Sequence, residues 1–226
     1  MSLDAKTNFL EQFPLFECLS QEERIELAGM MKTEKRTRYS MVYMPGDPSD
    51  EIYFLAKGTI KIGTHSSDGK EVIKSLIHPL AMFGELGIIG EKERQDYAQV
   101  LRDEVILYSL KNDDFRQMMR KNFDLCSQVM SSFGQRLMRA ENKLESLIFK
   151  DARTRIIDFI KDSVSDRGRR VGFEMLLKHS LTHQDIANIT CTSRQTVTLV
   201  LNDLKKSDLI YFNRGKILVR DMAKLA

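Results

Sequence analysis

Two short helical patterns joined by a tight polar turn lie between Leu181 and Lys206, and they constrain the fold more than any other stretch. Thr182 followed three residues later by Asp185 has the spacing of a capping box, which predicts the start of a helix. Ser193 is placed to cap a second helix. The apolar side of that second helix is formed by Val197, Val200, Leu201 and Leu204. The stretch therefore predicts two amphipathic helices packed as a hairpin.

The second of these helices has a polar face that suits DNA. Its members are Arg194, Gln195, Thr198 and Asn202. Guanidinium, amide and hydroxyl groups supply the donors and acceptors that read base edges in a major groove. Arg194 and Gln195 fall in the first turn, where a recognition helix meets base edges. A plain helical hairpin is the alternative, but a face this poor in acidic residues favours DNA binding.

The letters QDIAN, a short turn and then TSRQTVTLVLNDL resemble the helix-turn-helix of the Crp–Fnr family, the cyclic-AMP receptor and its relatives. Residues 209–219 add a predicted hairpin with a turn at Gly215, which would be the wing of a winged helix. Basic side chains at the tip of the wing would meet phosphates. The DNA-binding residues expected from the motif and this resemblance are Thr182, His183, Gln184, Ser193, Arg194, Gln195, Thr196, Thr198, Asn202, Arg214 and Lys216.

Three positions depart from the family pattern in this half of the chain. Cys191 stands at the turn glycine, Gln195 at an acidic residue, and Leu199 where the cyclic-AMP receptor has a later arginine. Glutamine pairs with adenine, whereas glutamate accepts a hydrogen bond from cytosine. We therefore expect a DNA site that differs from that of the cyclic-AMP receptor.

Short apolar runs alternate with turn signals from about residue 32 to residue 110. The runs are 51–55, 59–62, 72–76 and 105–108. This spacing predicts a small antiparallel barrel or sandwich. The phrase MPGDPSDEIYFLAKGTIKI resembles the β-roll of cyclic-nucleotide-binding domains, with Gly46 and Gly58 at its turns.

A short helix leaving a strand after glycine, at residues 83–89, offers backbone N–H groups that favour a phosphate. The stretch resembles the family's phosphate-binding cassette, in which Glu85 would hold a ribose hydroxyl. The expected effector pocket contains Phe83, Gly84, Glu85, Leu86, Arg94, Ala98, Ala140 and Glu141. No cofactor is predicted; the pocket is expected to take an unidentified small-molecule effector, if it takes one at all.

Two features of this pocket argue against cyclic AMP. The slot of the family's phosphate-binding arginine, counted back from Ala98, holds Asp96, which would repel a phosphate. Arg94 is two residues out of register. Ala140 and Glu141 replace the two hydroxyl residues that touch the adenine in cyclic-AMP binders. A re-purposed or empty pocket is therefore expected.

A heptad pattern follows the β-rich region, on one helix expected from Asp113 to Ile148. Its apolar positions recur with spacings of three and four at Cys126, Met130, Phe133, Leu137, Ala140, Leu144 and Leu147. Such a seam favours a coiled-coil partner, and the resemblance implies a homodimer. Packing of the helix on its own barrel is the alternative, and the two arrangements are compatible.

The remaining segments complete an α+β chain. Residues 9–31 predict short helices, with Ser20 and Glu23 as a capping box. Residues 149–151 resemble a hinge before a helix at 152–163. Residues 165–170 are expected to form a polar, basic loop, most simply a solvated turn; the resemblance implies a surface for RNA polymerase. The expected domains are 1–111 for sensing, 112–150 for dimerisation and hinge, and 151–226 for DNA binding.

Charge and composition agree with this division. Residues 151–226 hold 14 Lys and Arg against 9 Asp and Glu, whereas residues 1–150 hold 21 against 23. A basic C-terminal third fits a DNA-contacting module. No apolar run reaches the roughly 18 residues of a membrane span, and no signal pattern begins the chain. We therefore expect a cytoplasmic protein with no membrane partner.

The three cysteines have neither metal spacing nor an even disulfide framework, which fits a reducing compartment. Cys18 alone is too little for the cysteine cluster of the family's iron–sulfur branch. His65 and His78 are the candidate ligands for a haem, as in the family's haem branch. Lone histidines are more often structural. A reactive Cys126 or Cys191 has no His or Lys neighbour in sequence to support it. We expect no metal site.

The sequence shows no Ser-His-Asp order and no nucleotide-hydrolysing loop, so no enzymatic activity is expected. The favoured function is a dimeric regulator in which a signal at the β-roll moves the long helix. The two recognition helices would then lie about 34 Å apart on a palindromic operator. The alternative is a ligand-binding regulatory subunit that acts through protein–protein contacts.

Overall fold

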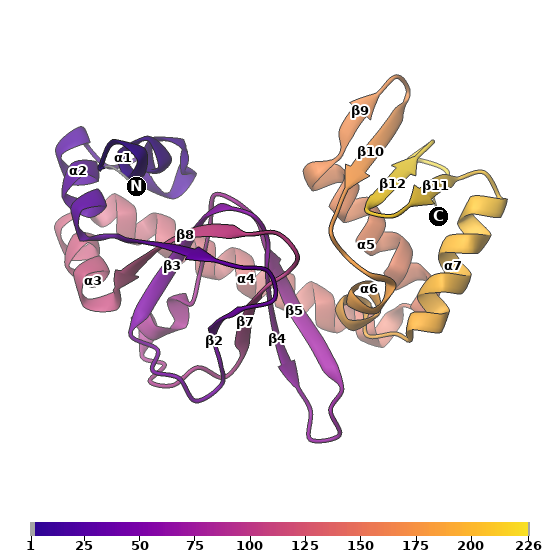
Figure 1. The fold of residues 1–226 in the computed structure, drawn as a ribbon, viewed down its shortest axis with the longest axis horizontal. Coiled ribbons are helices and arrows are strands. Elements are labelled where there is room, and N and C mark those ends of the chain that lie inside the picture. The colour runs from indigo at the N-terminus through magenta and orange to yellow at the C-terminus, as the bar shows by residue number, and fades with distance from the viewer. Residues whose placement is uncertain (1–2, 226) are drawn as a thin grey trace. The chain divides into compact units, whose positions relative to one another are not determined.

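Residues 3–225 of the 226-residue chain are described by the computed structural model, and they form two compact units (Figure 1). The first unit contains the residues up to Ser66 together with Lys74–Met138. The second unit contains Ser67–Ile73 and the residues from Arg139 onward. The boundary at Met138 falls inside a long helix.

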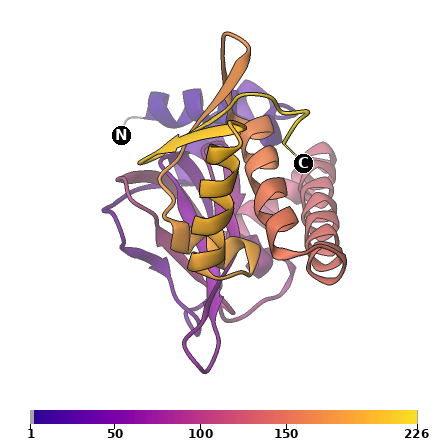
Figure 2. The same ribbon diagram turned by 90° about the vertical axis from the view of Figure 1, so that its right-hand side faces the viewer.

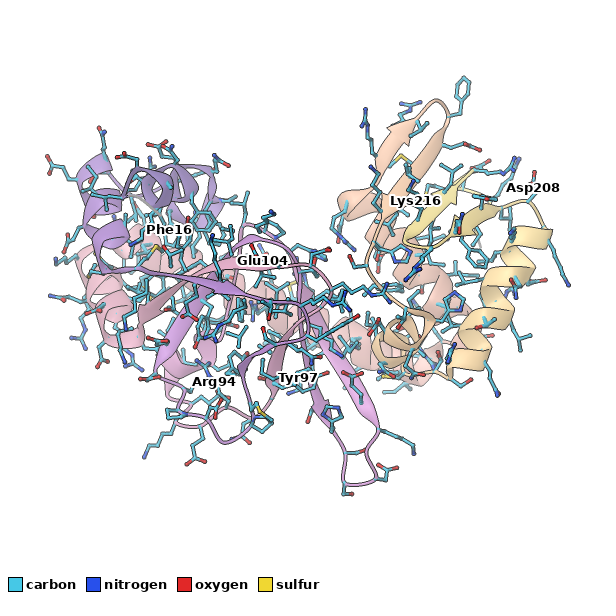
Figure 3. The ribbon with its side chains drawn as sticks, viewed as in Figure 1. Phe16, Arg94, Tyr97, Glu104, Asp208 and Lys216 are labelled. Atoms are coloured by element: carbon cyan, nitrogen blue, oxygen red, sulfur yellow. The ribbon has the colours of Figure 1, made fainter. Side chains whose placement is uncertain are left out.

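Short helices open the first unit: α1 (Leu3–Gln12), the 3-10 helix η1 (Pro14–Phe16) and α2 (Gln21–Met30). The capping box before α2 is as predicted. Ser20 Oγ accepts from the Glu23 N–H at 3.2 Å, and Glu23 Oε2 accepts from the Ser20 N–H at 2.8 Å. Phe16, labelled in Figure 3, packs edge-on against Phe54 with ring centroids 5.3 Å apart. These helices therefore close one side of the core of the β-roll.

The predicted antiparallel β-roll is confirmed as two four-stranded sheets. Their strand orders are β1-β8-β3-β6 and β2-β7-β4-β5. The strands are β1 (Lys32–Arg36), β2 (Met41–Tyr43), β3 (Glu51–Lys57), β4 (Ile60–His65), β5 (Glu71–Ile77), β6 (Ala81–Phe83), β7 (Tyr97–Val100) and β8 (Val105–Lys111). Leu55, Ile60, Val100 and Leu107 are fully buried between the sheets. The 3-10 helix η2 (Glu85–Ile89) follows β6 directly.

The expected single helix from Asp113 to Ile148 is wrong, because the chain breaks at Asn122. It forms α3 (Asn112–Lys121) and α4 (Phe123–Phe149). Asn122 has extended backbone, and its Oδ1 accepts from the Leu125 N–H at 3.0 Å. Its Nδ2 donates to Glu23 at 3.1 Å. The asparagine side chain thus competes with the helical ladder and starts a new helix.

Beyond α4, the second unit contains three helices and a four-stranded sheet. The helices are α5 (Ala152–Arg167), α6 (His183–Thr190) and α7 (Arg194–Lys206). The sheet has the order β11-β12-β10-β9, formed by β9 (Arg169–Val171), β10 (Glu174–Lys178), β11 (Ile210–Asn213) and β12 (Lys216–Val219). Figure 2 shows α5 and α7 side by side in this unit, and they are in contact.

The expected loop at residues 165–170 is also wrong. Helix α5 continues to Arg167, and Arg169–Val171 is strand β9, paired with β10 in an antiparallel hairpin. Glycine is required at position 168, between α5 and β9, because a Cβ there would lie 2.3 Å from the Val164 carbonyl oxygen. Gly172 turns the hairpin with a φ of +63°. The sequence pattern missed β9 because its three residues are all exposed and show no alternation.

Candidate DNA interface and effector pocket

Side-chain caps position the two helices of the helix-turn-helix. Thr182 Oγ1 accepts from the Asp185 N–H at 3.0 Å, and Asp185 Oδ2 accepts from the Thr182 N–H at 2.7 Å. Ser193 Oγ accepts from the Thr196 N–H at 3.0 Å at the start of α7. Both predicted caps are present. A serine or threonine cap of this kind typically stabilises a helix by about 1 kcal/mol.

Opposite faces of α7 meet the core and the solvent. The buried face is as predicted, formed by Val197, Val200, Leu201 and Leu204. Arg194, Gln195 and Asn202 are exposed on the polar face. Leu199 is exposed there as well, with 70% of its surface accessible. The predicted polar face did not include Leu199 because this residue is apolar. Its spacing of four residues from Gln195 nevertheless places it on that face.

Several expected DNA-binding residues also hold the motif together. His183 Nδ1 lies 2.9 Å from Thr198 Oγ1, so the first residue of α6 is tied to α7. The His183 ring also packs against Phe212, with centroids 5.9 Å apart. Burial, followed by the charge of Arg194, lowers the pKa of His183. Gln184 is exposed and donates to Asn188 at 2.8 Å.

The wing lies next to the C-terminal turn of α7. Strands β11 and β12 form the predicted hairpin, with Gly215 at a φ of +75° in its turn. Arg214 and Lys216 are both exposed at this turn, and Figure 3 labels Lys216. Lys205 of α7 lies over the Tyr211 ring at 5.2 Å. The end of α7 therefore contacts β11, and the turn of the wing carries two exposed cations.

The turn between α6 and α7 carries a conformation that glycine prefers. Cys191 has φ 51° and ψ 51°, the left-handed region, where a Cβ costs roughly 1–2 kcal/mol. Arg155 of α5 holds this turn: its Nε donates to the Thr190 carbonyl at 3.0 Å and its Nη2 to the Cys191 carbonyl at 3.2 Å. Sequence reasoning missed Arg155, since it stands 36 residues before the turn.

A buried ion pair occupies the expected effector pocket of the first unit. Glu85 begins η2, and its side chain is only 2% exposed. Arg136 of α4 donates both to Glu85 Oε1 and to the Met82 carbonyl oxygen. Burial raises the pKa of Glu85, and the Arg136 guanidinium opposes that shift. The carboxylate that would hold a ribose hydroxyl is thus already paired with Arg136, a residue that no sequence pattern indicated.

Arg94 is a structural residue in this pocket, although the sequence placed it out of register. It is 2% exposed and donates through Nη1 to the Gly84 carbonyl oxygen at 2.7 Å and through Nη2 to the Glu51 carbonyl oxygen. Its guanidinium lies 4.5 Å from the centroid of the Tyr43 ring. Figure 3 labels this side chain. Arg94 therefore fixes the backbone of the cassette, with its two terminal nitrogens engaged.

Aromatic rings are buried beside Arg94. Tyr53 stacks on Phe83 with centroids 5.2 Å apart. Burial raises the pKa of Tyr53 to about 12, and burial aided by the charge of Asp96 raises that of Tyr43. Both phenols are therefore neutral at physiological pH.

The other expected pocket residues are less closely grouped. Ala98 is fully buried in the β-roll core, whereas Leu86 is 42% exposed. Asp96, in the slot of the phosphate-binding arginine, pairs with Lys74 at 3.2 Å. Ala140 and Glu141 are exposed on the part of α4 that belongs to the second unit. The first unit by itself therefore brings Phe83, Gly84, Glu85 and Arg94 together.

Helix α4 packs on the core along one side and exposes most of its predicted heptad positions. Leu125 and Val129 are buried in the first unit, and Phe133 packs against the same core. Met130 is 55% exposed, Leu137 62% and Leu144 60%. Cys126 is half-buried and Ala140 and Leu147 are exposed. One helix thus packs on its own barrel and also presents an apolar stripe to solvent.

Within residues 3–225, no cluster of three or more His, Cys, Asp or Glu side chains is placed to hold a metal ion. The three cysteines are free thiols, each half-buried. No helix in the same range is both long and apolar enough to cross a membrane. His65 packs against the Tyr97 ring at 5.1 Å.

Comparison with known proteins agrees with both halves of this description. Residues 35–122 match the model of the cyclic nucleotide-binding domain, and residues 154–226 match that of the Crp-like helix-turn-helix domain. The chain is 30% identical over 185 residues to the CRP-like cAMP-activated global transcriptional regulator of Mycobacterium tuberculosis, covering 82% of each protein. It is 28% identical over 190 residues to the global nitrogen regulator of a Nostoc species, covering 84% of this chain and 85% of the relative.

A solved structure of a CooA mutant from Carboxydothermus hydrogenoformans has the same fold, with a TM-score of 0.77 at 20% identity over 88% of each chain. The family models and the mycobacterial relative carry the assignment beyond the fold. This chain belongs to the Crp–Fnr family of transcription regulators.

Proposed function

We propose that the chain is a homodimeric regulator that binds a palindromic DNA operator through α7 and senses a signal other than cyclic AMP in its β-roll. The exposed face of α7 carries the DNA part of this proposal. It presents guanidinium and amide groups at Arg194, Gln195 and Asn202, while the opposite face is buried. The positive balance of residues 151–226 adds attraction to phosphates.

The homodimer is supported by the apolar stripe on α4. Met130, Leu137 and Leu144 are each more than half exposed. Exposed leucines at heptad spacing are stabilised when a second helix covers them. A two-fold dimer presents α7 twice, and half-sites related by the same symmetry make the operator palindromic.

Two side chains of the expected effector pocket disfavour cyclic AMP as the signal. The Glu85 carboxylate is paired with Arg136, and Asp96 stands where a phosphate would need a cation. A cyclic nucleotide would have to break the first contact and tolerate the second. The mycobacterial relative is named for activation by cAMP, and the Nostoc relative for nitrogen regulation. The side chains of this chain favour a different effector from cyclic AMP.

A surface for RNA polymerase is assigned to the hairpin of β9 and β10. Its turn presents Phe173, which is 96% exposed, next to the exposed Arg169 and Arg170. An exposed ring flanked by two guanidiniums suits a protein surface that is apolar at its centre and acidic at its rim.

The test of the DNA role is salt-dependent binding by the full chain. An operator is first selected from a random duplex library, and affinity is then measured by fluorescence anisotropy at several salt concentrations. Each phosphate contact contributes about −0.9 to the slope of log K against log salt. We expect Lys216→Ala to reduce the slope by about 2 for a dimer, one contact in each subunit.

Lys57→Ala is the matched control, because it removes the same charge from an exposed position at the end of β3. It should leave the slope unchanged. Failure to select any sequence would contradict the proposal and favour a regulatory subunit that acts through protein contacts. A monomer in sedimentation equilibrium would contradict the dimer, and a rise in melting temperature with cyclic AMP would contradict the assignment of the signal.

A further inference from the structure

One large apolar side chain stands in the middle of the polar face of α7. Leu199 is 70% exposed. At about 100° per residue, it lies near Gln195 and Asn202 around the helix axis and roughly opposite Val197 and Leu204. Those last two residues are fully buried. Leu199 therefore buries little apolar surface when the chain folds. Its side chain is open to solvent on the face that is proposed to meet DNA.

The major groove of DNA offers one apolar group to such a side chain, the C5-methyl of thymine. We propose that Leu199 contacts a thymine methyl group in each operator half-site and so determines specificity there. This inference rests on the proposed DNA-binding function. It assigns a base to a position where a guanidinium would instead select guanine.

The spacing on the helix limits where that thymine lies. Gln195 and Leu199 are one turn apart, so their Cβ atoms are separated by about 6 Å. Successive base pairs rise by about 3.4 Å. If Gln195 pairs with an adenine, the thymine read by Leu199 lies within two base pairs of it.

The charge next to Leu199 is compatible with a DNA surface. Asp203 is an acidic residue of α7, and with Leu199 it lines a groove of about 730 Å³. Arg153 of α5 pairs with Asp203 at 2.6 Å. This pairing reduces the repulsion that Asp203 would exert on phosphates.

The test removes the methyl group from the DNA without changing base pairing. Each thymine of the selected operator is replaced in turn by deoxyuridine, and the affinity of the full chain is measured. We expect one position per half-site at which the replacement weakens binding about fourfold, the value of one buried methyl group. Replacement in both half-sites should weaken binding about fifteenfold.

Two variants make the assignment specific. In Leu199→Ala the loss caused by deoxyuridine should disappear at that position, whereas in Leu199→Arg a repeated selection should return guanine in its place. Ile25→Ala, which truncates an aliphatic side chain 44% exposed on α2, should keep the full thymine dependence.

The inference is overturned if no thymine responds to deoxyuridine, or if the response persists unchanged in Leu199→Ala. Either result leaves sequence-specific binding intact, so it is distinct from failure of the proposed function, in which no operator is selected at all.

Discussion

Replacement of Arg136 by alanine would leave a buried carboxylate without its cation. Glu85 is 2% exposed, and its Oε2 has no hydrogen-bond partner among the described residues. The contact between Oε1 and Arg136 therefore compensates for the burial of the charge. Removing one partner of a buried ion pair typically destabilises the folded state by about 3–5 kcal/mol. The first unit of Arg136→Ala is therefore expected to unfold more readily.

Protonation of Glu85 sets an upper limit to this loss. Holding a glutamic acid protonated costs about 1.36 kcal/mol for each pH unit above an unfolded pKa of about 4.3. The limit is about 3.7 kcal/mol at pH 7 and about 1 kcal/mol at pH 5. The lost hydrogen bond to the Met82 carbonyl adds about 1 kcal/mol at either pH.

The sign of the pH dependence follows from the direction of the pKa shift. Burial raises the pKa of Glu85, and loss of Arg136 removes the charge that opposes this rise. Below about pH 4.3 the folded and the unfolded states both hold the proton, so the carboxyl costs nothing. As the pH rises above that value, stability is lost. Arg136→Ala should therefore lose more stability at pH 7 than at pH 5, by up to about 2.7 kcal/mol.

Urea unfolding followed by circular dichroism at pH 5 and pH 7 measures this difference. One protein concentration is used throughout, because the stability of a dimer depends on it. Arg139→Ala, which truncates an exposed arginine on the same helix, is the control and should show no such pH dependence. Adding Glu85→Gln to Arg136→Ala should remove the pH dependence. A loss that is equal at the two pH values would refute the stranded carboxylate as its cause.

Two further predictions concern the second unit. Cys191→Gly should raise its stability by about 0.5–1 kcal/mol, because glycine adopts the left-handed backbone without the cost of a Cβ; Cys191→Ala is the control, and equal melting temperatures for the two variants would contradict the strain. His183 should titrate below its usual pKa of about 6.5, since burial and then the charge of Arg194 disfavour its protonated form. Stability should accordingly be lost as the pH falls below about 6.5, and His183→Gln should lack that dependence; an NMR titration midpoint above 6.5 would argue against it.

The sequence predicted best those features that depend on residues close together in the chain. The caps at Ser20, Thr182 and Ser193 each join residues three apart, and all three are present. The strands of the β-roll were visible as short apolar runs between turn residues, and β3 and β8 are buried over most of their length. Asn122 was missed because no proline or glycine marks a break between residues 113 and 126, while its side chain offers the backbone a local alternative to the helix.

The effector pocket and the turn of the helix-turn-helix depend more on contacts between residues that are far apart in the chain. Such contacts produce no pattern in the sequence. Arg136 reaches Glu85 across 51 residues, and Arg155 reaches Cys191 across 36. A single arginine on a helix has the same sequence signature whether it meets solvent or a buried carboxylate. Arg94 was expected in the pocket but two residues out of register for a phosphate, and its side chain contacts the Gly84 carbonyl instead.

Helix α4 connects the expected effector pocket to the proposed dimer interface. Arg136, which pairs with Glu85, immediately precedes Leu137, one of the exposed seam positions. Phe133, nearly one turn earlier, packs on the core of the first unit. An effector that takes Glu85 from Arg136 would release a guanidinium from a helix whose neighbouring residue is expected to contact the second subunit. Because a ligand shifts a conformational equilibrium only through contacts that differ between the two states, we propose the Glu85–Arg136 pair as a contact through which an effector would act on the proposed dimer.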